Sequence, residues 1–427
     1  MPPTSRLRPL PWCSAALRTG AGEGRPSPAP GVGVESMRGR WPVIQLGERG
    51  RHGAGPARQA WETAQALAAL GLPSLVFTPE ELPDQPGGTT VPVKWQALPL
   101  RSVVDGRSMR QLARLTRHRH APLLHAHGPV AHAVALGALL LGGRFQLLVR
   151  RSKSFPLPTL ARPTFRTRRV RGVVATCQAV REALVGTSGV AAEKVHVVYP
   201  GVDLEQLDLR RTRPAAVRLE LGISPQARLL VQVGSPDWKG WREVLAALPV
   251  IRSAAPDAHL LLVGYPRAEQ REWIATLARE LGVAEAVRVL PFRDDLPDIL
   301  AAGELVVDAA WAGTGLSRSL LEAMALARPV VATRCGGTPE LVEDGTTGLL
   351  VPPRDVATLA AAAARLLHDV ETARALAAAA RDRVASQFTT AHYAARLAAT
   401  YRRIEPAACG SPAPPPHPTP PPRAGDT

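Results

Sequence analysis

The turn at residues 313–315, Gly-Thr-Gly, lies between an apolar β-branched run at 305–307 and a predicted helix through Glu322. In a parallel sheet, such a turn places free backbone N–H groups and the positive end of a helix at the carboxyl edge, an arrangement that binds phosphate. Ser317 is positioned to cap the helix. Glu322, about one turn further on, can accept hydrogen bonds from sugar hydroxyls. These residue types predict a site for a nucleoside diphosphate that carries a sugar.

Lys239 is the residue best placed to balance the charge of a diphosphate. It precedes Gly240 and follows Gly234 by five positions, where a predicted strand gives way to a helix. A lysine at this position can reach a diphosphate as a compact positive charge. The alternative is an ordinary exposed lysine at a helix start. Because Trp238 and Trp241 flank it, we favour the ligand-binding interpretation.

Two histidines, His125 and His127, follow the apolar run at 123–124 and lie at the end of a predicted strand. An imidazole there can hydrogen-bond a sugar hydroxyl. We predict this role for His127, with a purely structural histidine as the alternative, and do not predict it for His125. The sequence gives no third ligand at metal-binding spacing, so it predicts no metal site and no cofactor.

Strand and helix patterns alternate along the chain in the manner of parallel, doubly wound sheets. At 427 residues the chain is longer than one hydrophobic core usually organises, so we expect two domains. The expected strands are residues 42–46, 75–77, 173–175, 195–198, 229–233, 259–263, 287–290, 305–307 and 329–333. The run at 130–141 is interrupted by His132 and Gly137 and is too short to span a bilayer, so it predicts a buried helix.

Several runs resemble those of the retaining glycosyltransferases of family 4, which have the GT-B fold. The runs are Glu-Ala-Met-Ala at 322–325, Pro-Val-Val-Ala-Thr at 329–333, Gly-Gly-Thr-Pro-Glu at 336–340, Thr-Gly-Leu-Leu-Val at 347–351 and Tyr-Pro-Gly-Val-Asp at 199–203. Two positions depart from the family pattern. Thr314 stands where the family has a glutamate, and Ser235 stands where it has an arginine.

The resemblance implies two Rossmann-like domains that face a cleft: an acceptor domain at 41–203 and a donor domain at 204–386, with a helix at 387–404 returning to the first. It implies metal-independent transfer of a sugar with retention of configuration, with Glu322 and His127 contacting the sugar. The implied donor-binding residues are Gly234, Ser235, Lys239, Phe292, Thr314, Gly315, Leu316, Ser317 and Arg318. Phe292 would touch the nucleotide base, whereas Asp295 is better explained as a helix cap.

The prediction of an acceptor site rests on two weaker sequence patterns. Gly53 and Gly55 permit close backbone approach to donor or acceptor. Arg150 and Arg151 open a run to residue 158 that resembles lipopolysaccharide-core and other envelope-sugar members of the family. These features favour an envelope glycan or a lipid-linked acceptor.

A net charge of +16 favours phosphate-rich partners. Arginines recur at three- and four-residue steps over 107–117, which predicts a basic amphipathic helix that is either a solvated face or a membrane-docking face. No aromatic-interleaved basic module is present, so nucleic acid is the weaker partner. Thr314 and Ser235 leave one alternative function open, a catalytically degenerate GT-B protein that only binds.

The two ends of the chain are predicted to be disordered. Residues 1–40 are rich in Pro, Gly and Arg without periodicity, and Met37 is a possible true start. Residues 405–427 form a Pro-rich tail. The four scattered cysteines favour a reduced, cytoplasmic setting, with the inner face of the membrane as the place of any lipid-linked acceptor.

Overall fold

The computed structural model describes residues 43–50, 55–80, 93–117, 123–265 and 267–404. The predictions made for 1–40, for Gly53 and for 405–427 lie outside these residues. Within the described part, no helix has the length and apolarity needed to cross a membrane.

Seven parallel strands form the first sheet, in the order β3-β2-β1-β4-β5-β6-β7. They are β1 (Val43–Gly47), β2 (Ser74–Thr78), β3 (Val93–Ala97), β4 (Leu123–His127), β5 (Gln146–Arg151), β6 (Val170–Ala175) and β7 (Val195–Val197). The connecting helices are α1 (Pro56–Ala68), α2 (Gly106–Arg117), α3 (Pro129–Leu140), α4 (Arg162–Arg166) and α5 (Gln178–Glu182). The predicted basic and buried helices are confirmed as α2 and α3. α5 is short and gives way to a wider π-helical turn at Ala183–Thr187.

Six parallel strands form the second sheet, in the order β10-β9-β8-β11-β12-β13. They are β8 (Arg228–Val233), β9 (Ala258–Val263), β10 (Val287–Leu290), β11 (Leu305–Asp308), β12 (Val330–Thr333) and β13 (Leu349–Val351). Its helices are α6 (Pro214–Glu220), α7 (Trp241–Ala254), α8 (Ala268–Glu280), α9 (Leu296–Ala302), α10 (Arg318–Ala325), α11 (Thr338–Leu341), α12 (Val356–His368) and α13 (Val370–Gln387). Two doubly wound parallel sheets confirm the predicted fold class.

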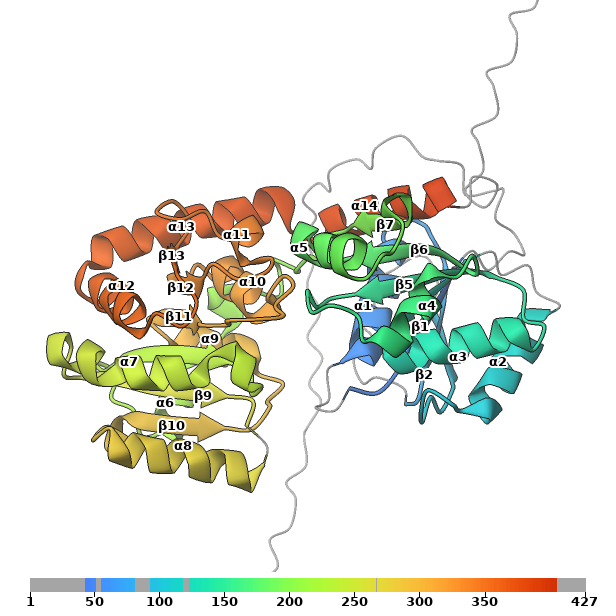
Figure 1. The fold of residues 1–427 in the computed structure, drawn as a ribbon. Coiled ribbons are helices and arrows are strands. Elements are labelled where there is room, and N and C mark those ends of the chain that lie inside the picture. Colours follow the sequence, from blue (N-terminus) through green and yellow to red (C-terminus); the bar gives the residue numbers. More distant parts are fainter. Residues whose placement is uncertain (1–42, 51–54, 81–92, 118–122, 266, 405–427) are drawn as a thin grey trace, which may run out of the picture. The chain divides into compact units, whose positions relative to one another are not determined.

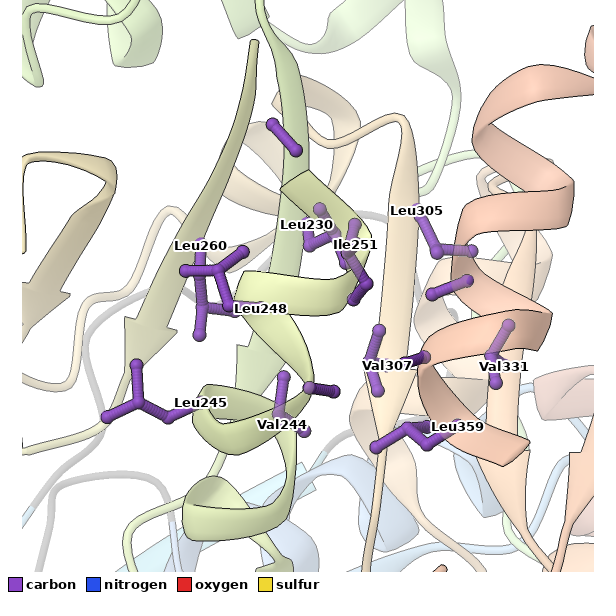
Figure 2. Packing of buried hydrophobic residues seen from close by; sticks show 14 of the residues in the cluster. Leu230, Val244, Leu245, Leu248, Ile251, Leu260, Leu305, Val307, Val331 and Leu359 are labelled. Carbon is purple, nitrogen blue, oxygen red and sulfur yellow. The ribbon is translucent and has the colours of Figure 1, made fainter. Parts of the chain in front are cut away.

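One face of the second sheet is buried by α7. Val244, Leu245, Leu248 and Ile251 follow helical spacing and form a single stripe. Figure 2 shows this stripe lying over Leu230 and Leu260 of the sheet, with Leu359 of α12 beside Val307 and Val331. Strands buried on both faces read as continuous apolar runs, which is why β8, β9 and β11 could be recognised in the sequence.

The last helix, α14 (Thr390–Ile404), packs on the first sheet although the second sheet precedes it in the chain (Figure 1). Its buried residues Tyr393, Leu397 and Tyr401 share one apolar cluster with Val43 of β1 and Leu123 of β4. The chain therefore crosses back to complete the core with which it began.

Candidate functional site

Lys239, Asp308 and Ser317 meet at the carboxyl edge of the second sheet. Lys239 Nζ donates to Asp308 Oδ2 at 3.0 Å and lies 3.3 Å from Ser317 Oγ. Ser317 Oγ donates to the same carboxylate oxygen at 2.6 Å. The Lys239 and Asp308 side chains are only 14% and 5% exposed, so this pair is well shielded from water. The structure thus brings together Lys239 and the turn that leads into α10.

Two glycines allow Lys239 to take this position. Gly234 has φ +119°, and a Cβ there would lie 3.1 Å from Lys239 Cγ. Gly240 has φ +77°, and a Cβ there would overlap the carbonyl of Ala309. Both conformations are open to glycine and costly for other residues. The Lys-Gly pair therefore brings the ammonium directly against the end of β11.

Ser317 stands at the N-cap position of α10, but its side chain makes no capping hydrogen bond. The prediction that it caps the helix is therefore wrong in its chemistry, because the hydroxyl bonds to Asp308 instead. Asp308 itself was missed in the sequence. An acidic residue closing the apolar run at 305–307, just before the glycine turn, was the signal that could have revealed it.

Glu322 is engaged by Arg318, whose Nε donates to Glu322 Oε1 at 2.8 Å. The same guanidinium bonds to both carboxylate oxygens of Glu62 on α1, at 2.5 and 2.9 Å. Arg58 in turn donates to Glu62 at 3.0 Å. Glu322, Arg318, Glu62 and Arg58 thus form a row of alternating negative and positive side chains. Arg318, a predicted donor-binding residue, contacts Glu322 through its side chain.

Thr314 lies in a closely packed part of the turn. Ser154 N donates to the carbonyl of Gly313 at 3.2 Å, and Ser154 Oγ donates to the carbonyl of Thr314 at 2.9 Å. Thr314 is 3% exposed, and its Oγ1 has no hydrogen-bond partner among the residues that the structure describes. A Cβ at Gly315 would overlap the carbonyl of Ser152. The backbone of this turn is fixed, whereas the Thr314 hydroxyl is buried and unpaired.

Two further predicted donor residues lie near this edge. Ser235 is 7% exposed, and its carbonyl accepts a hydrogen bond from Gln270 Nε2 at 3.4 Å. Phe292 is 42% exposed, and its ring lies 3.1 Å from the place a Gly264 Cβ would occupy. Asp295 makes no cap to α9; it pairs with Arg293, which corrects that prediction.

His127 is fully buried within a polar network of the first sheet. Its Nε2 lies 2.8 Å from Gln45 Oε1, and its Nδ1 has no partner among the described residues. His125 Nδ1 lies 2.8 Å from the Tyr401 hydroxyl, which also accepts from Gln45 Nε2 at 3.2 Å. Burial, followed by the charge of Arg150, lowers the pKa of His125 to about 3, so the network is neutral. A sugar-binding role for His127 stays a prediction.

The predicted acceptor residues lie at carboxyl ends of the first sheet. Arg150 and Arg151 end β5, and Arg151 Nη2 donates to the carbonyl of Phe155 at 2.9 Å. Gly55 precedes α1, and a Cβ there would lie 2.5 Å from Gly50 Cα, so Gly50 and Gly55 are in close backbone contact. Glu48 was missed: its carboxylate accepts from Ala131 N at 2.6 Å, and burial raises its pKa to about 7.

This arrangement is suited to stabilising negative charge that develops on a leaving diphosphate. The ammonium of Lys239 and the backbone N–H groups at the start of α10 are directed to the same edge of the sheet. Preorganised donors in a shielded site act more strongly than the same groups in water. In the structure Asp308 holds the ammonium, so any anion that binds Lys239 has to compete with that carboxylate.

Two family profiles match the chain, one on each sheet. The profile described as "Glycosyltransferase Family 4" matches residues 53–206, and that described as "Glycosyl transferases group 1" matches residues 227–369. Together with the two parallel sheets, these matches define a glycosyltransferase-type chain of the GT-B fold. The chain belongs to the family 4 glycosyltransferases.

Two curated mycobacterial relatives match parts of the chain. The D-inositol 3-phosphate glycosyltransferase of Mycobacterium sp. (strain JLS) is 34% identical over 182 residues, which is 41% of this chain and 40% of the relative. The GDP-mannose-dependent alpha-(1-6)-phosphatidylinositol monomannoside mannosyltransferase of Mycobacterium tuberculosis is 34% identical over 220 residues, 48% of this chain and 55% of the relative. The chain thus spans about half the length of these relatives.

Among solved structures, Anabaena Alr3699/HepE in complex with UDP and glucose superposes with a TM-score of 0.69. It is 22% identical, and the match covers 84% of this chain and 99% of the other. At this identity the likeness shows the fold.

Proposed function

We propose that this protein transfers a sugar from a nucleoside diphosphate sugar to a glycan or lipid-linked acceptor of the cell envelope, with retention of configuration. The observation that carries the proposal is the convergence of Lys239, Ser317 and the start of α10 at one shielded edge of the second sheet. Family membership and the UDP-bound structural relative support a nucleotide donor.

In the proposed reaction, Lys239 leaves Asp308 and takes the diphosphate, and the N–H groups that open α10 share its charge. Glu322 takes hydroxyl groups of the sugar or ribose when Arg318 yields one of its two carboxylate partners. We assign no protein nucleophile. The hydrogen bond between His127 and Gln45 holds the end of β4 in place on the side of the molecule that we assign to the acceptor.

The donor proposal is tested by thermal shift and by hydrolysis of UDP-glucose and GDP-mannose. A ligand that binds only the folded state raises the melting temperature. Lys239→Ala is expected to abolish the shift given by the preferred nucleotide and to reduce turnover about a hundredfold or more, as expected when a charge-stabilising donor is removed. Lys194→Ala is the matched control, because Lys194 only donates to the carbonyls of Arg166 and Thr167. Equal shifts for both variants would rule out the donor role of Lys239.

The acceptor proposal rests on the surface of the first sheet. Val103 and Val104, before α2, are 51% and 79% exposed, and Leu140 at the end of α3 is 70% exposed. The arginines of α2 are exposed as well. Apolar side chains set among exposed arginines suit an anionic lipid surface at the cytoplasmic face of the membrane. The mannosyltransferase relative, named for a phosphatidylinositol acceptor, supports a lipid-linked acceptor.

A catalytically degenerate binding protein is the second candidate. Its support is specific: Thr314 supplies a buried, unpaired hydroxyl where the family has a carboxylate, and Ser235 removes a second cation. The same experiment separates the two, since a degenerate protein would show a nucleotide-dependent thermal shift without turnover of any nucleotide sugar.

A further inference from the structure

The Gly-Gly-Thr-Pro-Glu run at 336–340 makes contacts that the donor site leaves unexplained. The carboxylate of Glu340, on α11, accepts hydrogen bonds from Gln178 N at 2.8 Å and from Ala179 N at 2.9 Å, both at the start of α5. It also accepts from the Tyr199 hydroxyl at 2.7 Å, just beyond β7. One side chain that follows β12 thus holds two segments that belong to the first sheet.

The glycines of the same run allow that contact. A Cβ at Gly337 would lie 2.7 Å from Cys177 Sγ, directly before α5. A Cβ at Gly336, whose φ is +54°, would overlap the carbonyl of Thr314 and lie 3.2 Å from Ser154 Oγ. Gly336 and Gly337 therefore fit between the donor turn and the first sheet, where any side chain would force them apart.

The donor turn lies next to this contact. Gly337 N donates to the carbonyl of Thr314 at 3.3 Å, and Lys153 forms an antiparallel bridge with Thr314. A displacement of Gly337 is thereby transmitted to the 313–315 turn. Burial, followed by the hydrogen bond with Glu340, raises the pKa of the Tyr199 hydroxyl, which keeps it a donor at neutral pH.

We infer that Glu340 is a positioning residue that fixes the donor turn against residues 152–155 by joining α11 to α5 and to Tyr199. A charged acceptor with three donors is among the stronger hydrogen-bonded groups, and the three donors of Glu340 come from the start of α5 and from Tyr199. Without the hydrogen bonds of Glu340, residues 152–155 would separate from Thr314 more often. The inference rests on the proposed function only for its effect on turnover.

The test compares Glu340→Gln, Tyr199→Phe and Glu343→Gln in the full chain by limited trypsin digestion. Glu343 is the matched control, because it lies three residues further on and pairs with Arg383 of α13. Cleavage between residues 150 and 154 is expected to speed up about tenfold in Glu340→Gln and less in Tyr199→Phe, because the paired segment opens more often. The control is expected to match the wild type.

Two results would overturn the inference: unchanged cleavage at 150–154 in folded Glu340→Gln, or an equal rise at every site, which marks general destabilisation. A second readout uses UDP-glucose, with kcat expected to fall more than tenfold while KM changes less than threefold in Glu340→Gln. Wild-type protein without any turnover would contradict the proposed function and leave the digestion result standing.

Discussion

At the scale of single residues, charge in the candidate donor site differs from the family pattern in two places. Ser235 replaces a cation and Thr314 replaces an anion, and in the structure Asp308 pairs directly with Lys239. The Lys239–Asp308 pair is compensated in the structure, so the site carries little net charge before a donor arrives. Under the proposed function, donor affinity depends on how readily Lys239 exchanges the Asp308 oxygen for an oxygen of the diphosphate.

The Thr314→Glu variant restores the carboxylate of the family pattern. A hydrogen bond to a charged group is worth about 1.5–3 kcal/mol, so donor turnover is expected to rise about tenfold to a hundredfold. Thr314→Gln, which has nearly the same size without the charge, is the control. Steady-state kinetics with UDP-glucose and GDP-mannose would measure both, and equal rates for the two variants would contradict the role given to this position.

Glu48 makes stability depend on pH. Its pKa is raised from about 4.5 to about 7 by burial, which outweighs the hydrogen bonds from the backbone of α3. The folded protein therefore holds the proton to higher pH than the unfolded chain does, and the free energy of unfolding falls as pH rises from 4.5 to 7. Glu48→Gln is expected to remove that fall and to be more stable than wild type at pH 8 by up to ~3 kcal/mol. Urea unfolding at pH 5 and pH 8 measures the difference; parallel profiles would refute it.

At the scale of elements, runs of apolar β-branched residues located most of the strands that shape the candidate site. The run at 305–307 became β11, and the one at 329–333 became β12. The sequence pattern did not predict β5, because its apolar centre, Leu147–Val149, is only three residues long and lies between Arg144 and Arg150. Helix ends were less predictable, since Ser317 and Asp295 occupy cap positions but bond elsewhere.

The buried network around α14 could not have been predicted from local sequence. Gln45, His125 and Tyr401 are separated by up to 356 positions along the chain, and only the packing of α14 brings them together. The same holds for the partner of His127, because Gln45 lies on a neighbouring strand of the sheet. Pairings of this kind depend on topology and not on spacing.

Tyr401→Phe tests that network. It removes the hydroxyl that serves both Gln45 and His125 and leaves buried polar atoms unpaired, at a cost of about 2–3 kcal/mol. Tyr393→Phe is the comparison, because its partner Thr63 keeps a hydrogen bond to the carbonyl of Gln59 and the loss should be about 1 kcal/mol. Urea unfolding of both variants would measure the two losses in free energy of unfolding. Equal losses would contradict the expectation that Tyr401→Phe is the more destabilising change.

At the scale of the whole molecule, positive charge is concentrated in one stretch. Between Asp105 and Glu182 the sequence has 15 lysines and arginines and no acidic residue. The second sheet instead pairs many of its arginines with carboxylates, as Arg218 does with Glu304 and Arg293 with Asp295. An anionic surface would therefore attract the molecule through the first sheet and its helices.

Flotation with vesicles that contain phosphatidylserine measures this attraction. Replacing the arginines of α2 (Arg107, Arg110, Arg114 and Arg117) by glutamine is expected to weaken partitioning about a hundredfold or more, at ~1 kcal/mol for each charge. The control carries four glutamines at Arg242, Arg354, Arg365 and Arg374, which are also exposed but lie on the second sheet's helices and loops. If the two variants partition equally onto the vesicles, net charge alone explains the attraction and α2 has no special role.

The crossing of α14 has a consequence for biosynthesis. Residues 43–197 emerge from the ribosome with one flank of their sheet uncovered, and the segment that shields it is translated only after the entire second sheet. During that interval Gln45, His125 and Val43 face solvent or a chaperone. A circular permutant that starts at Thr390 and joins Ile404 to Val43 through a linker would supply the cover first, and its nascent chain should become protease-resistant earlier than that of the natural order.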